Sequence, residues 1–369
     1  MTVHSILEKA LQLVPLTEDE ALFIYENAST NELMETAATL RQQHVSGNGV
    51  SWQIDRNVNY TNVCISGCLF CNFHCKRHET EKHYTTTIEE YDKKIETLFA
   101  KGGNQLLLQG GLHPEYGLDF YESLFRKLKQ RYPSIKLHAL GPPEVAHIAK
   151  LEKMNYRETL QRLIAAGLDS LPGAGAEILT NRVRKILSPA KPDVQAWLDV
   201  MREAHRLNLP TSATMMFGHI ETLRERIQHL LLIRDLQNEK PKDAFGFLAF
   251  ICWSVQSRGT VLAERYKLQP VTPVEYVRTI AISRIVLNNI QNIQASWLTV
   301  GRATAQLCLH SGANDLGSIM IEENVLAAAG VSEQMDAEMM QQTIREAGFE
   351  PWLRDQKYLP VKHLTDKIN

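Results

Sequence analysis

Two kinds of hydrophobic spacing alternate along most of this chain. Short apolar or β-branched runs recur, and each is followed by a loop and then by apolar residues at helical spacing. In one such segment, Leu118, Tyr121, Phe125 and Leu128 fall on a single helical stripe. The runs predict eight strands, at 51–59, 104–109, 136–140, 168–172, 210–217, 245–252, 292–299 and 315–321.

Capping signals mark where the intervening helices begin and end. A Ser or Thr followed three residues later by Glu forms a capping box, which starts a helix. Gly167 and Asn208 stand where helices should stop before a strand. Eight strands alternating with helices predict a (β/α)8 TIM-type barrel, with a doubly wound open sheet as the alternative. Capping boxes within this region are Thr87 with Glu90, Thr222 with Glu225, and Thr272 with Glu275.

The two ends of the chain lack this alternation. Residues 1–48 show helical patterns only, and the sequence SGNG at 46–49 breaks the chain before the first strand. We therefore expect an N-terminal helical extension at 1–48, the barrel at 49–325, and a C-terminal helical segment packed on the barrel at 326–369.

Composition narrows the functional classes. The chain has 369 residues, of which 44% are hydrophobic and 22% charged, as in a globular protein with a large core. A formal net charge of −2 provides no basic field, so nucleic acid is not an expected partner. No apolar run approaches the roughly 20 residues that span a bilayer. The N-terminus does not read as a secretory signal, and we expect a cytoplasmic protein.

The strongest chemical signal is a group of cysteines just beyond the first predicted strand. Cys64, Cys68 and Cys71 have the spacing C-x3-C-x2-C. Three thiolates on one loop can hold three irons of a [4Fe–4S] cluster and leave the fourth open to chelate S-adenosylmethionine (SAM). The motif is therefore typical of radical SAM proteins. Phe70, directly before the third cysteine, is placed to shield the cluster and approach the adenine.

A closed metal site is the alternative interpretation of the same loop. Cys75 adds a fourth thiol, and three histidines nearby offer further ligands for zinc. Structural zinc sites usually combine two separated ligand pairs, so we interpret Cys75 as a spare. Cys252 and Cys308 fall within predicted elements, where a buried and inert cysteine is the default. The histidines are His74, His78 and His83.

Two glycine motifs follow at later strand ends. Gly110 and Gly111 end the second strand, where a backbone without side chains can approach the methionine part of SAM. Gly218 and Glu221 form G-x-x-E after the fifth strand, where radical SAM proteins pack the adenosyl group. Either motif also suits an ordinary turn or helix start.

Other polar residues at strand ends are candidates to line a cavity, because barrel active sites gather at the carboxyl ends of the strands. Each of them also has a structural interpretation. Glu144 and His147 could imitate a metal pair, but no further ligands support one. The candidates are Gln109, Glu144, Glu177, Arg184, His219 and Gln256.

Longer stretches of the chain resemble the cyclic dehypoxanthine futalosine synthases, the radical SAM cyclases of the futalosine route to menaquinone. The resemblance extends from the first strand to the last. The matching stretches are DRNVNYTNVC (55–64), LLLQGG (106–111), GPPEVAHIA (141–149), LDSLPGAGAEIL (168–179), ATMMFGHIET (213–222), QASW (294–297) and GANDLGSIMIEENV (312–325).

The resemblance implies a nucleoside-type substrate, a [4Fe–4S] cluster, SAM, and a low-potential electron donor of the flavodoxin or ferredoxin type. A 5′-deoxyadenosyl radical would remove the hydrogen at C4′ of the ribose of dehypoxanthine futalosine. The carbon radical would add to the attached benzoate ring, and loss of a proton and an electron would give the cyclic product. The protein supplies alignment and exclusion of side reactions.

This chemistry suggests roles for several residues. The substrate carboxylate needs a cationic or amide partner, for which Arg56, Arg184, Arg302 and Gln256 are the candidates. The final proton needs an acceptor, for which Glu144, Glu177 and His219 are the candidates. Gln109 joins Phe70, the two glycines and the G-x-x-E motif as a candidate cofactor contact.

The chain departs from the family pattern at two places, and we expect both to shape the substrate pocket. Cys252, Ser254 and Ser257 replace prolines around the strand-six tryptophan, and Ala174 interrupts a run of glycines. One alternative is the sister aminofutalosine synthase, which adds the same kind of radical to an enolpyruvyl benzoate. Another is a non-catalytic iron–sulfur or zinc protein built on the barrel.

Overall fold

Three helices precede the barrel in this computed structural model, which describes residues 2–76, 78–330 and 333–361. They are α1 (Val3–Leu11), α2 (Glu18–Asn27) and α3 (Thr30–His44). The capping boxes Thr17 with Glu20 and Ser29 with Glu32 start the second and third helices. Helix α3 then packs against α12 (Pro273–Val286) on the outside of the barrel.

The first predicted strand forms as two consecutive strands, β1 (Gly49–Gln53) and β2 (Asp55–Asn59). Strand β1 pairs in parallel with β8 (Asp315–Ser318), and β2 pairs in parallel with β3 (Gln105–Gln109). Residues 49–59 therefore connect the β2–β3 pair at the start of the barrel with the β1–β8 pair at its end.

The remaining strands continue the parallel ring. They are β4 (Lys136–Ala139), β5 (Thr211–Phe217), β6 (Phe247–Ser254) and β7 (Asn292–Ala295). The order runs from β2 through β4 in one sheet and from β5 through β8 to β1 in the other.

The predicted fourth strand, 168–172, contributes only single bridges. Ser170 bridges to His138 of β4, and Leu171 bridges to Thr211 of β5. A longer strand is prevented because Pro172 has no N–H to donate and the Gly173 N–H donates to the Ser212 hydroxyl over 3.3 Å instead of to a backbone oxygen. These bridges still connect the two sheets, so the strands follow the predicted barrel order, and the (β/α)8 prediction is confirmed.

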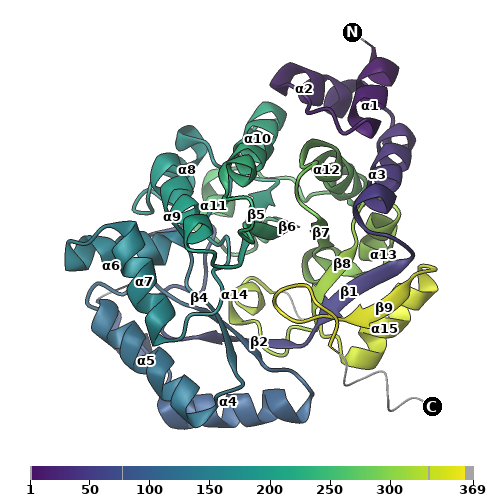
Figure 1. The fold of residues 1–369 in the computed structure, drawn as a ribbon. Helices are drawn as coiled ribbons and strands as arrows, with labels where there is room; N and C mark the ends of the chain where they lie inside the picture. Colours follow the sequence, from purple (N-terminus) through teal and green to yellow (C-terminus); the bar gives the residue numbers. More distant parts are fainter. Residues whose placement is uncertain (1, 77, 331–332, 362–369) are drawn as a thin grey trace, which may run out of the picture.

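Helices surround this ring of strands (Figure 1). Capping boxes start α4 at Thr87 and α10 at Thr222, whereas at Thr272 only the threonine accepts the expected hydrogen bond. The seventh strand ends at Ala295, earlier than predicted, because α13 begins at Trp297. None of the described helices is long and apolar enough to cross a membrane. The surrounding helices are α4 (Ile88–Ala100), α5 (Leu118–Arg131), α6 (Pro142–Glu152), α7 (Tyr156–Ala166), α8 (Asn181–Leu187), α9 (Val194–Arg206), α10 (Leu223–Glu239), α11 (Val261–Arg265), α12 and α13 (Trp297–Leu309), with a short 3-10 helix, η1 (Thr80–Lys82).

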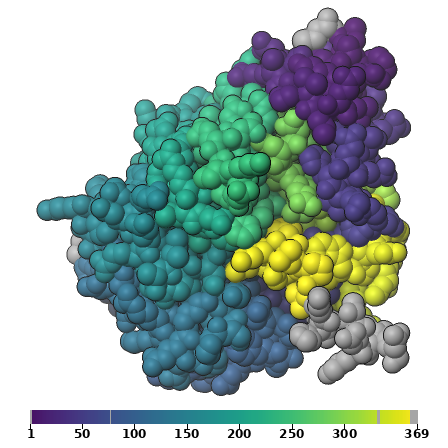
Figure 2. Space-filling view, viewed as in Figure 1, coloured from purple at the N-terminus to yellow at the C-terminus, as the bar shows by residue number. Residues whose placement is uncertain are grey.

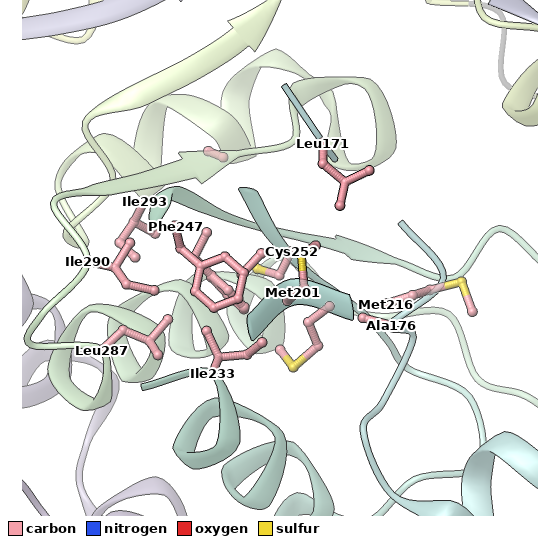
Figure 3. Close-up of a cluster of buried hydrophobic side chains, with 14 of the residues drawn as sticks. Leu171, Ala176, Met201, Met216, Ile233, Phe247, Cys252, Leu287, Ile290 and Ile293 are labelled. Atoms are coloured by element: carbon pink, nitrogen blue, oxygen red, sulfur yellow. The ribbon is translucent and has the colours of Figure 1, made fainter. Parts of the chain in front are cut away.

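Apolar side chains fill the layer between strands and helices. On α9, helical spacing places Trp197, Met201 and Ala204 in the core. Phe247 of β6 and Ile233 of α10 belong to the same buried cluster (Figure 3). This packing holds the strands in place while the barrel interior remains free for polar side chains.

The C-terminal segment contains a strand in addition to the helices that were expected there. Helices α14 (Asn324–Ala327) and α15 (Ala337–Glu346) lead into β9 (Glu350–Leu353), which pairs in parallel with β1. In Figure 2 this segment, in yellow, lies between the N-terminal helices, in purple, and the first barrel units, in blue and teal. Residues 362–369 of the predicted tail lie outside the described residues.

Candidate active site

A cavity of about 390 Å³ lies inside the barrel. Phe70 and Gln109 line it at the carboxyl ends of the strands, while Arg354, Gln356 and Tyr358 line it on the side of the C-terminal segment. Its volume falls within the range of about 300–1,000 Å³ that small-molecule sites usually have.

The cysteine loop follows β2 directly, at the carboxyl ends of the strands. The Ser66 hydroxyl oxygen lies 2.8 Å from the Cys64 sulfur and 3.3 Å from the Cys68 sulfur. The backbone N–H of Leu112 donates to the Cys64 sulfur over 3.3 Å. All three motif cysteines are free thiols. Hydrogen-bond donors aimed at the sulfurs of a three-thiol loop fit an iron–sulfur cluster, whose potential such bonds tune.

Backbone bonds anchor this loop to the later barrel units. Leu69 donates its N–H to the Leu187 oxygen at the end of α8, and its own oxygen accepts from the Leu262 N–H of α11, each over 2.8 Å. Phe70 therefore faces the cavity from a loop held on two sides.

The groups that would close a four-ligand site have other partners. The Cys75 thiol lies 3.5 Å from the Glu79 oxygen, and its backbone N–H donates to the Asn62 oxygen over 2.8 Å. His74 and His83 each bind a backbone carbonyl oxygen, at 2.7 and 2.9 Å. Within the described ranges, no three Cys, His, Asp or Glu side chains meet around a single metal position. Ligands of a [4Fe–4S] cluster bind separate irons and need not do so.

Both glycines after β3 are required by close packing. A Cβ at Gly110 would lie 2.7 Å from the Tyr60 ring, and one at Gly111 would lie 2.1 Å from the Val63 oxygen. The glycine pair therefore allows the cysteine loop to lie directly against the end of β3. Contact with SAM at this position remains a prediction.

The G-x-x-E motif is tied into a buried network. The Glu221 carboxylate accepts from the Gly218 N–H and from the Arg226 guanidinium, both over 2.7 Å. Burial disfavours its charge, but His219 and Arg226 outweigh burial and hold the pKa of Glu221 well below its usual range. Gly218 has a φ of +88°, and a Cβ there would lie 2.1 Å from Val271. The motif thus stabilises the turn after β5.

His219 is not placed to act as a base in the cavity. Its ring lies 2.8 Å from the Glu221 carboxylate and 2.9 Å from the Met216 oxygen. The side chain is fully buried and is not among the residues that line the cavity. This candidate assignment is therefore corrected to a structural one.

The three arginine candidates are also occupied elsewhere. Arg56 pairs with Glu322 at 2.8 Å, on the outer face of β2. Arg184 donates to the backbone oxygens of Gly175, Ala176 and Pro192, and Arg302 donates to the Thr343 hydroxyl of α15. None of the three lines the cavity, because each guanidinium instead joins loops or helices.

A lysine that carries no motif provides the cation in this part of the cavity. Lys191 lies between α8 and α9, lines the cavity, and forms a 2.7 Å ion pair with Glu177. Its ammonium lies 5.6 Å from the centre of the Phe70 ring. Burial opposes its charge, yet Cys68 and Glu177 raise the pKa of Lys191. The only sequence signal was a single Lys between two prolines, which spacing rules do not detect.

The two glutamate candidates differ in charge state. Glu177 lines the cavity, and although burial opposes its charge, Lys191 and Arg184 lower its pKa. Its φ of +44° is unusual for a residue with a side chain. Burial raises the pKa of Glu144 to about 7, and this carboxyl lies outside the cavity lining.

The departures from the family pattern divide into two groups. Ala174 and Ser254 line the cavity, as does the candidate Gln256, whose amide donates to the Ser254 oxygen over 3.2 Å. Cys252 lies in the core, where burial raises its pKa to about 12. Ser257 does not line the cavity.

Comparison with known proteins agrees with this geometry. Residues 58–233 match the radical SAM superfamily, and residues 244–367 match the CofH/MqnC C-terminal region. Two solved structures share the fold at low sequence identity. Methylornithine synthase (PylB) has a TM-score of 0.70 at 18% identity, covering 95% of this chain and 98% of its own. The hydrogenase maturase HydG from Carboxydothermus hydrogenoformans has a TM-score of 0.74 at 14% identity, covering 96% and 80%.

Curated relatives match over nearly the full length. A cyclic dehypoxanthine futalosine synthase of Streptomyces coelicolor is 39% identical, over 96% of this chain and 88% of its own. One from Halalkalibacterium halodurans is 37% identical, over 100% and 97%. A 5-amino-6-(D-ribitylamino)uracil--L-tyrosine 4-hydroxyphenyl transferase of Methanosarcina mazei is 38% identical, over 97% and 92%.

These matches and the cysteine loop above the cavity lead to one conclusion. The chain is an enzyme that uses a [4Fe–4S] cluster and SAM to act on a small molecule. It belongs to the radical SAM superfamily and, within it, to the family of enzymes that share the CofH/MqnC C-terminal region.

Proposed function

We propose that this enzyme is a cyclic dehypoxanthine futalosine synthase, which closes a ring in its substrate on the way to menaquinone. The observation that carries the proposal is the similarity, at 39% and 37% identity over nearly the whole chain, to two relatives of that name. An enclosed, mostly apolar cavity next to the cysteine loop suits a substrate that has both an aromatic ring and a sugar.

Three residues are proposed to hold the cluster. Cys64, Cys68 and Cys71 lie on one anchored loop, with Ser66 between the first two sulfurs. The bound cluster and SAM supply the 5′-deoxyadenosyl radical that starts the reaction. Phe70 covers the cavity on the side of this loop. Enclosure limits the access of water and of competing side chains.

The Lys191–Glu177 pair is proposed to bind the methionine end of SAM. That end carries a carboxylate and an ammonium, which are complementary to a buried ammonium and carboxylate. Both side chains line the cavity, and Lys191 lies over Phe70 on the cysteine loop. The pair is thus close to the cofactor side of the cavity before any ligand binds.

Glu144 is the proposed proton acceptor of the three acidic and basic candidates. Burial raises its pKa to about 7, which suits a group that takes and releases a proton near neutral pH. Glu177 is held charged by Lys191, and His219 is tied to Glu221. Because Glu144 lies behind the cavity wall, a water molecule or a small movement would connect its carboxyl with the substrate.

We further propose an electron donor of the flavodoxin or ferredoxin type and a cytoplasmic location.

The experiment is an anaerobic assay of the reconstituted enzyme. Dithionite, SAM and dehypoxanthine futalosine are supplied, and the products are followed by mass spectrometry. We expect a substrate-dependent rise in 5′-deoxyadenosine and a product two hydrogens lighter than the substrate. SAM cleavage without that product would remove the substrate assignment and leave the radical SAM assignment intact.

A second candidate is transfer of a tyrosine-derived group to a ribitylaminouracil. It is favoured by the 38% identity to the Methanosarcina mazei transferase, which lies between the 39% and 37% identities to the two synthases. Parallel assays with 5-amino-6-(D-ribitylamino)uracil plus tyrosine, and with the enolpyruvyl benzoate of the sister synthase, separate the three activities by product mass.

A further inference from the structure

Three buried side-chain oxygen atoms, in residues that line one wall of the cavity, have no hydrogen-bond partner in the described part of the chain. They are Oδ1 of Asp55, Oδ1 of Asn57 and Oε1 of Gln105. The three residues are only 4%, 2% and 6% exposed, and all three line the cavity. Buried polar atoms without partners are rare in native proteins, and each one needs an explanation.

Strand geometry places the three side chains on the same face. Asp55 and Asn57 are two residues apart on β2, so both point to the same side of the sheet. Gln105 is the register partner of Asp55 on β3. The open oxygens therefore belong to one compact patch on the inner wall of the barrel.

The hydrogen bonds that these side chains already make fix which atoms remain open. The amide nitrogens of Gln53 and Gln105 both donate to Oδ2 of Asp55, over 2.7 and 3.3 Å. The Asn57 amide nitrogen donates to Glu323 over 2.7 Å. Turning either the Asn57 or the Gln105 amide over would place its oxygen against a carboxylate oxygen. The open atoms of Asn57 and Gln105 are consequently acceptors.

We infer that Asp55, Asn57 and Gln105 form a subsite that binds the sugar hydroxyls of the substrate. Hydroxyl groups donate to amide and carboxylate oxygens, whereas the benzoate carboxylate and the ketone-type oxygens of a substrate would be repelled by them. Burial raises the pKa of Asp55, but a hydroxyl both donates and accepts and pairs with this carboxyl in either form. The subsite rests on the proposed function, whose substrate carries a ribose.

The subsite also orients the substrate. With the ribose against β2 and β3, the benzoate ring has to occupy the part of the cavity lined by β5, β6 and β7, where Trp253 and Met216 lie. Asp55, Asn57 and Gln105 are thus positioning residues that select a sugar-bearing substrate.

The test combines substrate analogues with variants. Binding of dehypoxanthine futalosine and of its 2- and 3-deoxyribose analogues is measured on the cluster-loaded enzyme with SAM present. For the wild type we expect removal of one hydroxyl to weaken binding about tenfold, as for a hydrogen bond to a buried acceptor. In Asn57→Ala and Gln105→Met, the difference between substrate and at least one analogue should fall to within about twofold.

Gln294→Met is the matched control, because Gln294 lines the same cavity from β7. This variant should retain the full penalty for the missing hydroxyl. Iron content and melting temperature verify that each variant is folded and loaded. The inference is overturned if both subsite variants keep the wild-type penalty while the wild type converts the substrate. A wild type that neither binds nor converts it would overturn the proposed function and the subsite together.

Discussion

Lys191 is the residue whose importance rests most on three-dimensional position. Replacing it with Met removes the cation that faces Glu177 and Phe70 in the cavity. Because charge-assisted hydrogen bonds contribute about 1.5–3 kcal/mol, we expect SAM to bind roughly tenfold to a hundredfold more weakly in Lys191→Met. The dissociation constant for SAM on the cluster-loaded enzyme is the measurement.

The control for this prediction is Lys185→Met, which removes an exposed lysine of α8. It should leave the affinity for SAM unchanged. Equal affinity in the wild type and in Lys191→Met, at equal iron content, would show that Lys191 only stabilises Glu177.

Glu144 makes the stability of the folded protein depend on pH, and substituting this residue isolates its contribution. Its pKa is raised to about 7 by burial, so the carboxyl is neutral in the folded protein where it is already charged in the unfolded chain. Between pH 4.5 and 7 this group therefore reduces the stability of the wild type progressively, by up to about 3 kcal/mol.

In Glu144→Gln this loss is absent, so the variant should gain stability relative to the wild type as pH rises to about 7, and the difference should then level off. Denaturant unfolding at pH 5, 6, 7 and 8 measures it. The exposed Glu89→Gln on α4 should show no such trend. A pH-independent difference for Glu144→Gln would mean that its carboxyl titrates normally when folded.

Individual site residues were predicted only in part. Three of the six strand-end candidates, Gln109, Glu177 and Gln256, line the cavity, and so does Phe70, which was predicted from its place beside the third cysteine. Lys191 was missed because a lone lysine carries no pattern. Asp55 and Asn57 had a detectable signal, since polar residues two apart on a barrel strand share its inner face.

At the scale of elements, variants of the cysteine loop should distinguish a cysteine that binds the cluster from one that does not. Cys71→Ser should lose most of the cluster, whereas Cys75→Ser should retain iron and sulfide close to wild-type levels. The reason is that the Cys75 thiol contacts the Glu79 oxygen and its backbone holds the loop to Asn62. Iron and sulfide analysis after anaerobic reconstitution, with the absorbance of the cluster, measures both. Loss of iron from both variants alike would favour a four-thiol site.

Elements were predicted more reliably than their ends. Seven of the eight predicted runs contain strands because their apolar period is clear, and the predicted capping boxes at Thr87 and Thr222 formed. The run at 168–172 was shortened by Pro172 and by the Gly173 N–H, which donates to the Ser212 hydroxyl and thus depends on the position of a distant side chain. The arginines failed as site predictions because their guanidiniums bind Glu322, loop carbonyl oxygens and the Thr343 hydroxyl instead. A sequence does not show which partner a guanidinium will bind.

At the scale of the whole molecule, Arg354 joins the end of β9 to the barrel. It pairs with Asp315 of β8 at 2.6 Å, and both side chains are buried. Arg354→Met leaves Asp315 charged and without this partner, so we expect a loss of about 3–5 kcal/mol in unfolding free energy. Denaturant titration measures it.

Arg345→Met serves as the comparison, since Arg345 is exposed on α15 a few residues earlier. Its effect should stay within about 0.5 kcal/mol. Similar losses in both variants would mean that the Arg354–Asp315 pair adds no stability.

The repeated alternation of strands and helices predicted a parallel α/β fold and favoured the barrel, but by itself it left the doubly wound open sheet as an alternative. It was not sufficient to predict β9, whose partner β1 lies about three hundred residues earlier. Pairing across such a distance leaves no local pattern, and Glu350–Leu353 is short and only half-buried.

The pairing of β1 with β8 and β9 also sets the order of events during synthesis. On the ribosome, the first barrel strand emerges long before residues 315–318 and 350–353, which supply its neighbours. Until then its backbone groups have no sheet partner, and such exposed strand edges favour aggregation. The nascent chain therefore has to wait until these distant segments are made before the first strand is paired, and folding assistance in the cell should matter most during that interval.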